Sequence, residues 1–477
     1  MAGDERQAAI RRIAHRKHTA LRPVSLVVAV VLLLAAACSS SGAPTSAGPA
    51  VQSSAAGSGK VVVPPDTPAG AQLGWLIAAT AHLPLSDAEV RAHFNPGFLA
   101  MVSPATLNQS LQPGRVRLVS VKVSEPTMII AVVSAGGEGR QDRVTLVVDS
   151  RGLISGLDSG PVIPEPVPTT WAGVDAALRS VAPQIRLLVA NVTDGSCRSV
   201  HSIDPATPAP IGSVLKLYVL TALSTAVAAG TVRWDQTLAI TAQVKSPGSV
   251  LQYEPDGTQI SVRDTATKMI SISDNTASDM LINLVGRSAV EAALTTAGMA
   301  NPALDRPALT SRETFILELQ QWPTLAQRYL ATNEAGRRAL LADTIDRLPL
   351  PDAATMRALG THTTAPGWVA SASDLCRAYT KLAALTRRPG LSPIGQALSL
   401  NDLGLELDPA QWRTTWFKGG TAPGAGALTY LATTRTGQSY VVTVLVRNPS
   451  PPKDDRGRVN AILLSAIKAA FTLAAHG

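Results

Sequence analysis

A serine and a lysine three residues apart open a long apolar run with helical spacing. Residues 210–223 read Pro-Ile-Gly-Ser-Val-Leu-Lys-Leu-Tyr-Val-Leu-Thr-Ala-Leu, in which the pair is Ser213 and Lys216. Residues three apart share one face of a helical turn. A serine hydroxyl becomes a strong nucleophile when a base takes its proton, and burial can lower the pKa of a lysine enough to make it that base. The pattern therefore predicts a reactive Ser213 activated by Lys216.

The Ser-x-x-Lys spacing is a weak signal by itself, because it occurs twice more in this chain. Ser450 is followed by two prolines, which give no rigid helix to fix its lysine. Ser465 lies within the expected last helix, where the pair is interpreted as a surface stripe. Only Ser213 follows a glycine at the start of a helix, where backbone N–H groups and the positive end of the helix dipole face the site. Position thus favours Ser213 over the other two serines.

Two later stretches supply groups suited to the same chemistry. Residues 273–275 read Ser-Asp-Asn, a hydroxyl and a carboxamide that a tight turn can direct into one cleft. Residues 418–421 read Lys-Gly-Gly-Thr, and glycines beside a strand lysine let a substrate approach the backbone closely. Each stretch has a structural alternative, since Ser, Asp and Asn are favoured helix caps and a glycine pair also makes a turn between strands.

The three stretches resemble, in the same order, the Ser-x-x-Lys, Ser-Asp-Asn and Lys-Thr-Gly motifs of class A β-lactamases and penicillin-binding proteins. The 60 residues from Ser213 to Ser273 are similar to the class A separation. Residues 252–255, Gln-Tyr-Glu-Pro, resemble the tyrosine-containing loop at the rim of the class A cleft. The resemblance covers residues 169–477 and implies a β-lactamase/transpeptidase-like domain, in which helices flank an antiparallel sheet beside a helical subdomain.

The resemblance also implies a role for each reactive side chain. Ser213 would be the acylated nucleophile and Lys216 its base. Ser273 would pass a proton to the leaving nitrogen, while Lys418 would keep that serine in a positive environment and attract a substrate carboxylate. No cofactor and no metal is expected at such a site.

The remaining implied roles concern substrate binding. Asn275 would bind the acyl side chain, and Tyr253 would form a wall of the cleft. The backbone N–H groups of Ser213 and Thr421, the latter next to Gly420, would form the oxyanion hole that stabilises the charge of the transition state.

Two departures from the family pattern bear on turnover. Gly419 stands where the family has threonine, so a hydroxyl that helps to hold a substrate carboxylate is missing, and Thr421 is the nearest replacement. Class A enzymes release the acyl group with a loop glutamate followed four residues later by asparagine, and no glutamate between residues 276 and 417 has that neighbour. Glu313 is the candidate base by region, although it can equally be a carboxylate in the first turn of a helix. Acylation is therefore better supported than fast hydrolysis.

The N-terminus is typical of an exported chain. Residues 1–38 hold a basic start, a 14-residue apolar run that is too short to span a membrane, and Ala-Ala-Ala before Cys38. This resembles a bacterial lipobox with alanine in place of the usual leucine, so Cys38 is the expected lipidation site and the chain is expected on the outer face of the cell membrane. The alternative is an ordinary cleaved signal with an incidental cysteine.

A smaller domain is expected before the motif-bearing one, as 477 residues favour two or three domains. Residues 39–63 read as a flexible tether, residues 64–160 as an α+β domain, and residues 161–168 as a proline-rich linker. This layout resembles mycobacterial LpqF-type lipoproteins, which implies an NTF2-like or cystatin-like fold for the first domain. Its predicted helices are 69–82 and 86–102, and its predicted strands are 115–123, 128–135, 143–149 and 153–157.

The second domain is predicted to build one sheet from distant parts of the chain, with helices inserted between them. Two cysteines, Cys197 and Cys376, remain in the mature chain, and single burial is the expected state, with a disulfide left open by the exported context. The predicted helices at the two ends are 171–181 and 460–475, and the predicted strands are 185–191, 198–203, 415–418, 427–433 and 439–447.

Composition excludes several classes of function. Hydrophobic residues make up 45% of the chain, enough for a large core. The net charge of +8 gives no basic stripe with interleaved aromatics, so nucleic-acid binding is not indicated. No His-Glu-x-x-His or Gly-x-Ser-x-Gly motif occurs. Three hypotheses remain: a hydrolase that is acylated by β-lactams, an esterase or peptidase of the cell envelope using the same serine, and a non-catalytic binding lipoprotein on this fold.

Overall fold

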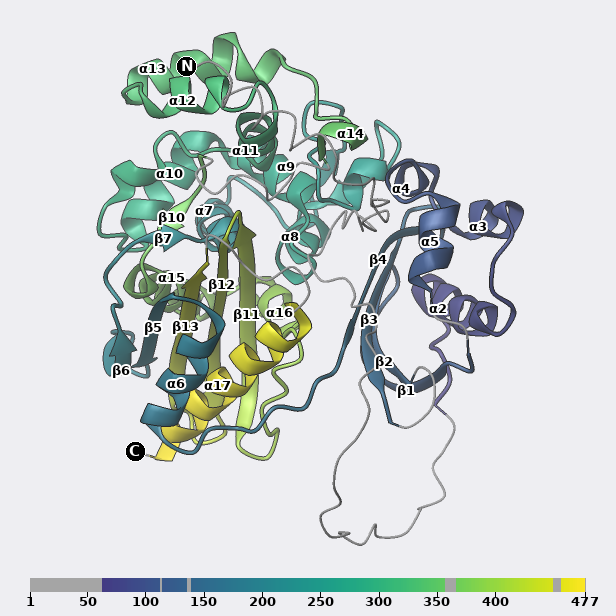
Figure 1. The fold of residues 1–477 in the computed structure, drawn as a ribbon. Coiled ribbons are helices and arrows are strands. Elements are labelled where there is room, and N and C mark those ends of the chain that lie inside the picture. Colours follow the sequence, from purple (N-terminus) through teal and green to yellow (C-terminus); the bar gives the residue numbers. More distant parts are fainter. Residues whose placement is uncertain (1–61, 112–113, 135–138, 357–365, 449–455, 477) are drawn as a thin grey trace, which may run out of the picture.

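The computed structural model describes residues 62–111, 114–134, 139–356, 366–448 and 456–476 (Figure 1). The predicted signal segment with Cys38, almost all of the predicted tether, and Ser450 lie outside the described residues.

The N-terminal domain is an antiparallel sheet in the order β1-β2-β3-β4 with helices packed on one face (Figure 1). Its core lies between that face and the helices, and Leu73, Phe94, Ile129 and Leu146 are almost completely buried in it. The α+β character predicted for this region is confirmed. Its elements are α2 (Pro68–Ala79), α3 (Asp87–His93), α4 (Pro96–Met101), α5 (Pro104–Ser110), β1 (Arg117–Glu125), β2 (Met128–Ser134), β3 (Gln141–Val148) and β4 (Ile154–Pro161).

The single helix predicted over residues 86–102 is wrong, because the chain breaks it into α3 and α4. Pro96 has no N–H to donate to a preceding turn and so is suited to the first turn of a new helix. The Asn95 side chain caps that helix by accepting from the backbone N–H groups of Gly97 and Phe98.

The second domain is built around a five-stranded antiparallel sheet in the order β11-β12-β13-β5-β6. Strands from the beginning and the end of the domain's sequence pair directly, since β5 lies beside β13. Alternation along β5 serves both faces: Leu187 and Val189 enter the core beneath α6 and α17, whereas Leu188 and Ala190 enter the core on the other face. The strands are β5 (Gln184–Asn191), β6 (Arg198–Ile203), β11 (Trp412–Ala422), β12 (Ala425–Thr434) and β13 (Ser439–Arg447).

Helices cover both faces of this sheet, and further helices form a helical region beside it (Figure 1). Helices α6 and α17 lie together on one face, and α15 and α16 pack on the other. This arrangement matches the implied β-lactamase-like fold. The helices are α6 (Trp171–Val181), α7 (Lys216–Ala228), α8 (Val262–Ser271), α9 (Asn275–Val285), α10 (Arg287–Thr296), α11 (Ser311–Leu319), α12 (Thr324–Leu330), α13 (Glu334–Asp343), α14 (Ala353–Met356), α15 (Ala372–Thr386), α16 (Ser392–Ser399) and α17 (Arg456–His476).

Helix α17 is the one described helix that is long and apolar enough to cross a membrane, over Gly457–His476. Ile467 and Phe471 are nevertheless completely buried against the sheet, and the Phe471 ring lies 5.2 Å from that of Trp412. These contacts make α17 a core helix of the second domain.

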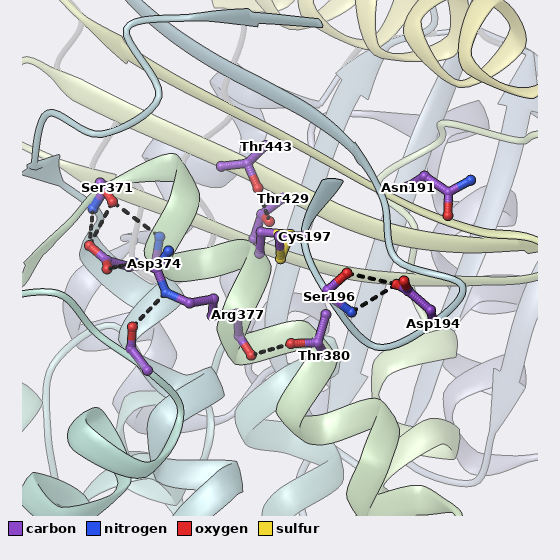
Figure 2. The surroundings of a disulfide bond; sticks show 12 residues. Asn191, Asp194, Ser196, Cys197, Ser371, Asp374, Arg377, Thr380, Thr429 and Thr443 are labelled. Carbon is purple, nitrogen blue, oxygen red and sulfur yellow. Dashed lines mark hydrogen bonds and ion pairs between the residues drawn. A yellow bond between two sulfur atoms is a disulfide. The ribbon is translucent and has the colours of Figure 1, made fainter. Parts of the chain in front are cut away.

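The expectation that the two cysteines are buried singly is wrong. Cys197, at the end of the β5–β6 turn, forms a disulfide with Cys376 of α15 (Figure 2). The edge of the sheet and α15 lie side by side, which brings the two Cα atoms to 6.3 Å despite a sequence separation of 179. Figure 2 shows, near this bond, the Ser371–Asp374 capping box at the start of α15 and Arg377, which donates to Asp374. The disulfide thus ties the sheet to the helical region.

Candidate active site

Ser213 lies in a 3-10 turn, Gly212–Leu215, that leads directly into α7. The preceding strand β7 (Ala209–Pro210) pairs with β10 (Val369–Ala370), so the chain that enters the turn is anchored. Gly212 has φ +47°, and a Cβ there would lie 2.1 Å from the carbonyl oxygen of Thr421. Only glycine therefore fits before the serine, and it brings the turn close to β11.

The pair of Ser213 and Lys216 has the geometry of a nucleophile and its base. Lys216 is completely buried, and its Nζ lies 3.1 Å from Ser213 Oγ. Nζ also donates to the Ser273 carbonyl oxygen at 2.5 Å and to Asn275 Oδ1 at 2.6 Å, neither of which can donate in return. A neutral amine has two N–H groups, so these two bonds leave its lone pair for the Ser213 hydroxyl. Burial lowers the pKa of Lys216 to about 7, which makes that neutral form available.

Ser273 stands on a strained turn between α8 and α9. Its φ is +59°, which is uncommon for a residue with a side chain. The carbonyl oxygen accepts from Lys216, and the hydroxyl lies 3.3 Å from Lys216 Nζ and 2.9 Å from Lys418 Nζ. The Ser273 hydroxyl can therefore exchange a proton with either lysine amine.

Lys418 lies on β11, and its Nζ reaches the same Ser273 hydroxyl as Lys216 Nζ. Only 2% of Lys418 is exposed, and its Nζ also donates to the carbonyl oxygen of Gly419. Burial and the neighbouring Lys216 hold the pKa of Lys418 well below its usual range. Two buried amines on one hydroxyl disfavour simultaneous protonation, so the site is poised to take up and release a proton near neutral pH.

The glycines after Lys418 bring the strand backbone against the serine turn. A Cβ on Gly420 would lie 2.0 Å from the carbonyl oxygen of Ile211 and 2.8 Å from the backbone nitrogen of Ser213. The strand backbone before Thr421 thus lies directly beside the Ser213 amide, where the oxyanion hole is expected. A Cβ on Gly419 would lie 2.8 Å from the Phe417 ring, so a side chain at this position requires that ring to move.

Asn275 is brought into the site, but its amide is already committed. Oδ1 accepts from Lys216, and Nδ2 donates to the carbonyl oxygen of Pro247 at 2.7 Å. In this structure Asn275 therefore orients Lys216, and the predicted contact with an acyl side chain would require Nδ2 to leave Pro247.

The prediction that Tyr253 forms a wall of the cleft stays a prediction, and the side chain is partly buried against the cores of both domains. Its ring lies against the N-terminal domain, where a Cβ on Gly97 would be 2.5 Å from it, and its hydroxyl is buried without a hydrogen-bond partner. Burial raises the pKa of that hydroxyl. The sequence places Tyr253 correctly on a turn before the Ser-Asp-Asn motif, but that turn faces the other domain.

The proposed base Glu313 is not brought to the serine. It is 2% exposed and forms a capping box with Thr310 at the start of α11. Its two oxygens also accept from Arg287 at 2.5 and 3.1 Å. The alternative role, a carboxylate in the first turn of a helix, is therefore confirmed.

Two carboxylates to which the sequence analysis assigned no role, Asp274 within the Ser-Asp-Asn motif and Asp279 after it, form hydrogen bonds that hold the neighbouring segments. Asp274 accepts four hydrogen bonds around the Ser-Asp-Asn turn. Asp279 is buried one helical turn after Asn275 and accepts from the backbone N–H groups of Ser311 and Arg312, at 2.7 and 2.8 Å. Burial raises the pKa of Asp279 to about 7. The sequence signal that could have identified Asp279 is its spacing of four residues from Asn275.

The described residues contain no carboxylate hydrogen-bonded to Ser213 or Lys216, and no group of three or more potential metal ligands. The second Ser-x-x-Lys serine that can be followed, Ser465, donates to the carbonyl oxygen of Pro166 and lies on α17, away from these groups. Ser213 is therefore surrounded by the groups of the candidate site, whereas Ser465, which has the same Ser-x-x-Lys spacing, is not.

The serine turn, the buried lysine, the serine between two lysines and the glycine-opened edge strand together have the arrangement that the resemblance to β-lactamases implies. The comparisons agree with this class: residues 172–383 match the Beta-lactamase enzyme family, and residues 64–154 match the family described as ORF 12 gene product N-terminal. No curated protein matches the chain.

Among solved structures, the chain is similar to a β-lactamase from Sphaerobacter thermophilus, with 19% identity over 64% of this chain and 98% of that chain and a TM-score of 0.45. PBP-A has 18% identity over 65% and 100% of the two chains, with a TM-score of 0.42. A β-lactamase from Chitinophaga pinensis has 17% identity over 64% and 98%, with a TM-score of 0.43.

Proposed function

We propose that this protein is a serine hydrolase that is acylated by β-lactams at Ser213 and releases the acyl group slowly. The observation that carries the proposal is the contact of Ser213 Oγ with Lys216 Nζ at 3.1 Å, in which carbonyl acceptors occupy both N–H groups of a buried amine. A lysine with only a structural role is not expected to combine complete burial, a lowered pKa and a lone pair that faces a serine hydroxyl.

In the acylation step, Ser213 Oγ bonds to the lactam carbonyl carbon while Lys216 takes its proton. The carbonyl oxygen becomes an oxyanion beside the Ser213 and Thr421 amides, and the ring C–N bond then breaks as the charge collapses. Ser273, whose hydroxyl lies between the two lysines, passes a proton to the leaving nitrogen and is reprotonated from Lys216. The balance is one new ester bond, one broken amide bond and one proton moved.

Slow release of the acyl group is expected because the two candidate carboxylates are engaged in other hydrogen bonds. Hydrolysis of the ester needs a base that activates water beside Ser213. Glu313 is bound to Arg287, and both oxygens of Asp279 accept backbone N–H groups of α11. A long-lived ester is therefore the expected product.

We further propose an exported, Cys38-anchored protein whose first domain has an NTF2-like fold, in the layout of LpqF-type lipoproteins. The Cys197–Cys376 disulfide supports an oxidising compartment. Detergent-phase partitioning of the full chain from cells, lost on Cys38→Ala, tests the anchor; partitioning of this variant unchanged would contradict it.

The proposed reaction is tested with a fluorescent penicillin and gel detection. Wild type is expected to be labelled covalently, Ser213→Ala unlabelled, and the matched control Ser465→Ala labelled like wild type. Absence of label on wild type, or label that survives Ser213→Ala, would overturn the proposal. Nitrocefin then separates the substrate classes: stoichiometric opening without turnover agrees with slow release, whereas labelling by an ester-directed fluorophosphonate alone favours an envelope ester or peptide as substrate.

A further inference from the structure

The two domains meet at a turn that leads to the active site, which we call the rim turn (residues 249–254). Glu254 at its end is 7% exposed, and its carboxylate accepts from two groups of the N-terminal domain. These are the backbone N–H of Ser150 at 2.9 Å and the Ser150 hydroxyl at 2.6 Å. Ser150 lies in the turn between β3 and β4, so one domain binds the other through a charged acceptor with two donors.

A second contact holds the neighbouring residue of the rim turn. Asn95 Nδ2 donates to Asp149 Oδ2 at 2.7 Å and reaches the carbonyl oxygen of Tyr253 at 3.4 Å. The Tyr253 ring packs on Gly97, where any side chain would displace it. The N-terminal domain therefore fixes both the backbone and the ring of this part of the turn.

The opposite end of the rim turn binds the Ser-Asp-Asn motif. The Asp274 carboxylate accepts from the Ser249 hydroxyl at 2.6 Å and from the N–H groups of Val250 and Leu251 at 2.8 and 3.1 Å. Its remaining bond, at 2.8 Å, comes from Ala277 at the start of α9. Three of the four groups that orient Asp274 thus belong to the turn that the N-terminal domain holds.

Asp274 is directly bonded along the chain to Ser273, whose φ of +59° persists only while its surroundings enforce it. We propose that the N-terminal domain positions the proton relay of the second domain, with Ser150 and Glu254 as the positioning residues. The proposal rests on the function proposed above. Loosening the rim turn releases Asp274, lets Ser273 relax, and moves its hydroxyl away from Lys418 and Lys216.

The test compares Ser150→Ala and Glu254→Gln with wild type in the full chain. The matched control is Lys122→Met, which removes a 3.0 Å bridge to Glu406 between the same two domains, away from the rim turn. Ser150→Thr keeps the hydroxyl and serves as the conservative rescue. Two quantities are measured: the fluorescent-penicillin acylation rate at saturating probe, and hydrogen–deuterium exchange of peptides covering 249–254 and 274–277.

Ser150→Ala and Glu254→Gln are expected to be acylated about tenfold more slowly, with unchanged half-saturating probe concentration and faster exchange in both peptides, because small displacements of a relay group are costly in rate. Lys122→Met and Ser150→Thr are expected to behave like wild type. Wild-type acylation and exchange in both variants would overturn the inference. If wild type itself is not acylated, the proposed function fails, and the exchange comparison still decides whether the domains are coupled.

Discussion

At the scale of single residues, the proposed mechanism makes the pH dependence of acylation follow the protonation of Lys216. Only the neutral amine can accept the Ser213 proton, and burial lowers the pKa from 10.5 to about 7. The acylation rate constant is therefore expected to rise about tenfold per pH unit below pH 7 and to level off above it. Stopped-flow labelling between pH 5.5 and 8.5 measures this; a profile that is flat below pH 7, or a rate that is still rising tenfold per unit at pH 8.5, would contradict Lys216 as the base.

Sequence identifies the reactive groups of the site better than their partners. The Ser213–Lys216 pair is predictable because helix geometry fixes residues three apart. The roles of Asn275 and Tyr253 are not, because each depends on what occupies the space around a turn: the Pro247 carbonyl in one case and the N-terminal domain in the other.

At the scale of secondary-structure elements, Glu313 fixes the start of α11. Its carboxylate is buried, pairs with Arg287 and accepts the Thr310 N–H. Arg287 keeps 25% of its side chain exposed, so solvent weakens the penalty of losing the pair. Glu313→Gln is expected to lower the free energy of unfolding by about 2 kcal/mol, with unchanged acylation and release rates. Urea unfolding and single-turnover nitrocefin measure the two effects; slower release at unchanged stability would restore Glu313 as the deacylating base.

The main strands of both domains and the two end helices of the second domain could be predicted from hydrophobic periodicity, including α6 over Trp171–Val181 and β13 over Ser439–Arg447. The prediction of one helix over 86–102 was wrong because Asn95 caps a new helix and Pro96 occupies its first turn, and these local signals outweigh a continuous amphipathic pattern. The role of Glu313 could not be read from its own segment, since its partner Arg287 lies 26 residues earlier.

At the scale of the whole molecule, the disulfide closes a loop that contains most of the site. Ser213, Lys216 and Ser273 lie between Cys197 and Cys376, whereas Lys418 lies outside. The sheet that carries Lys418 is therefore covalently tied to the region that carries the nucleophile. Sequence left this bond open because it depends on the packing of α15 against the edge of the sheet.

Replacing both cysteines, Cys197→Ser with Cys376→Ser, is expected to lower the free energy of unfolding by about 5 kcal/mol. Cross-linking across a sequence separation of 179 removes much of the entropy of the unfolded chain, and the loss of the bond restores it. Acylation at 20 °C should persist, because the hydrogen bonds of the Lys216 and Lys418 amines do not involve the sulfurs. Guanidinium unfolding of wild type with and without reductant checks this, and the double variant should be insensitive to reductant. Equal unfolding midpoints for oxidised wild type and the variant would show that packing alone joins α15 to the sheet.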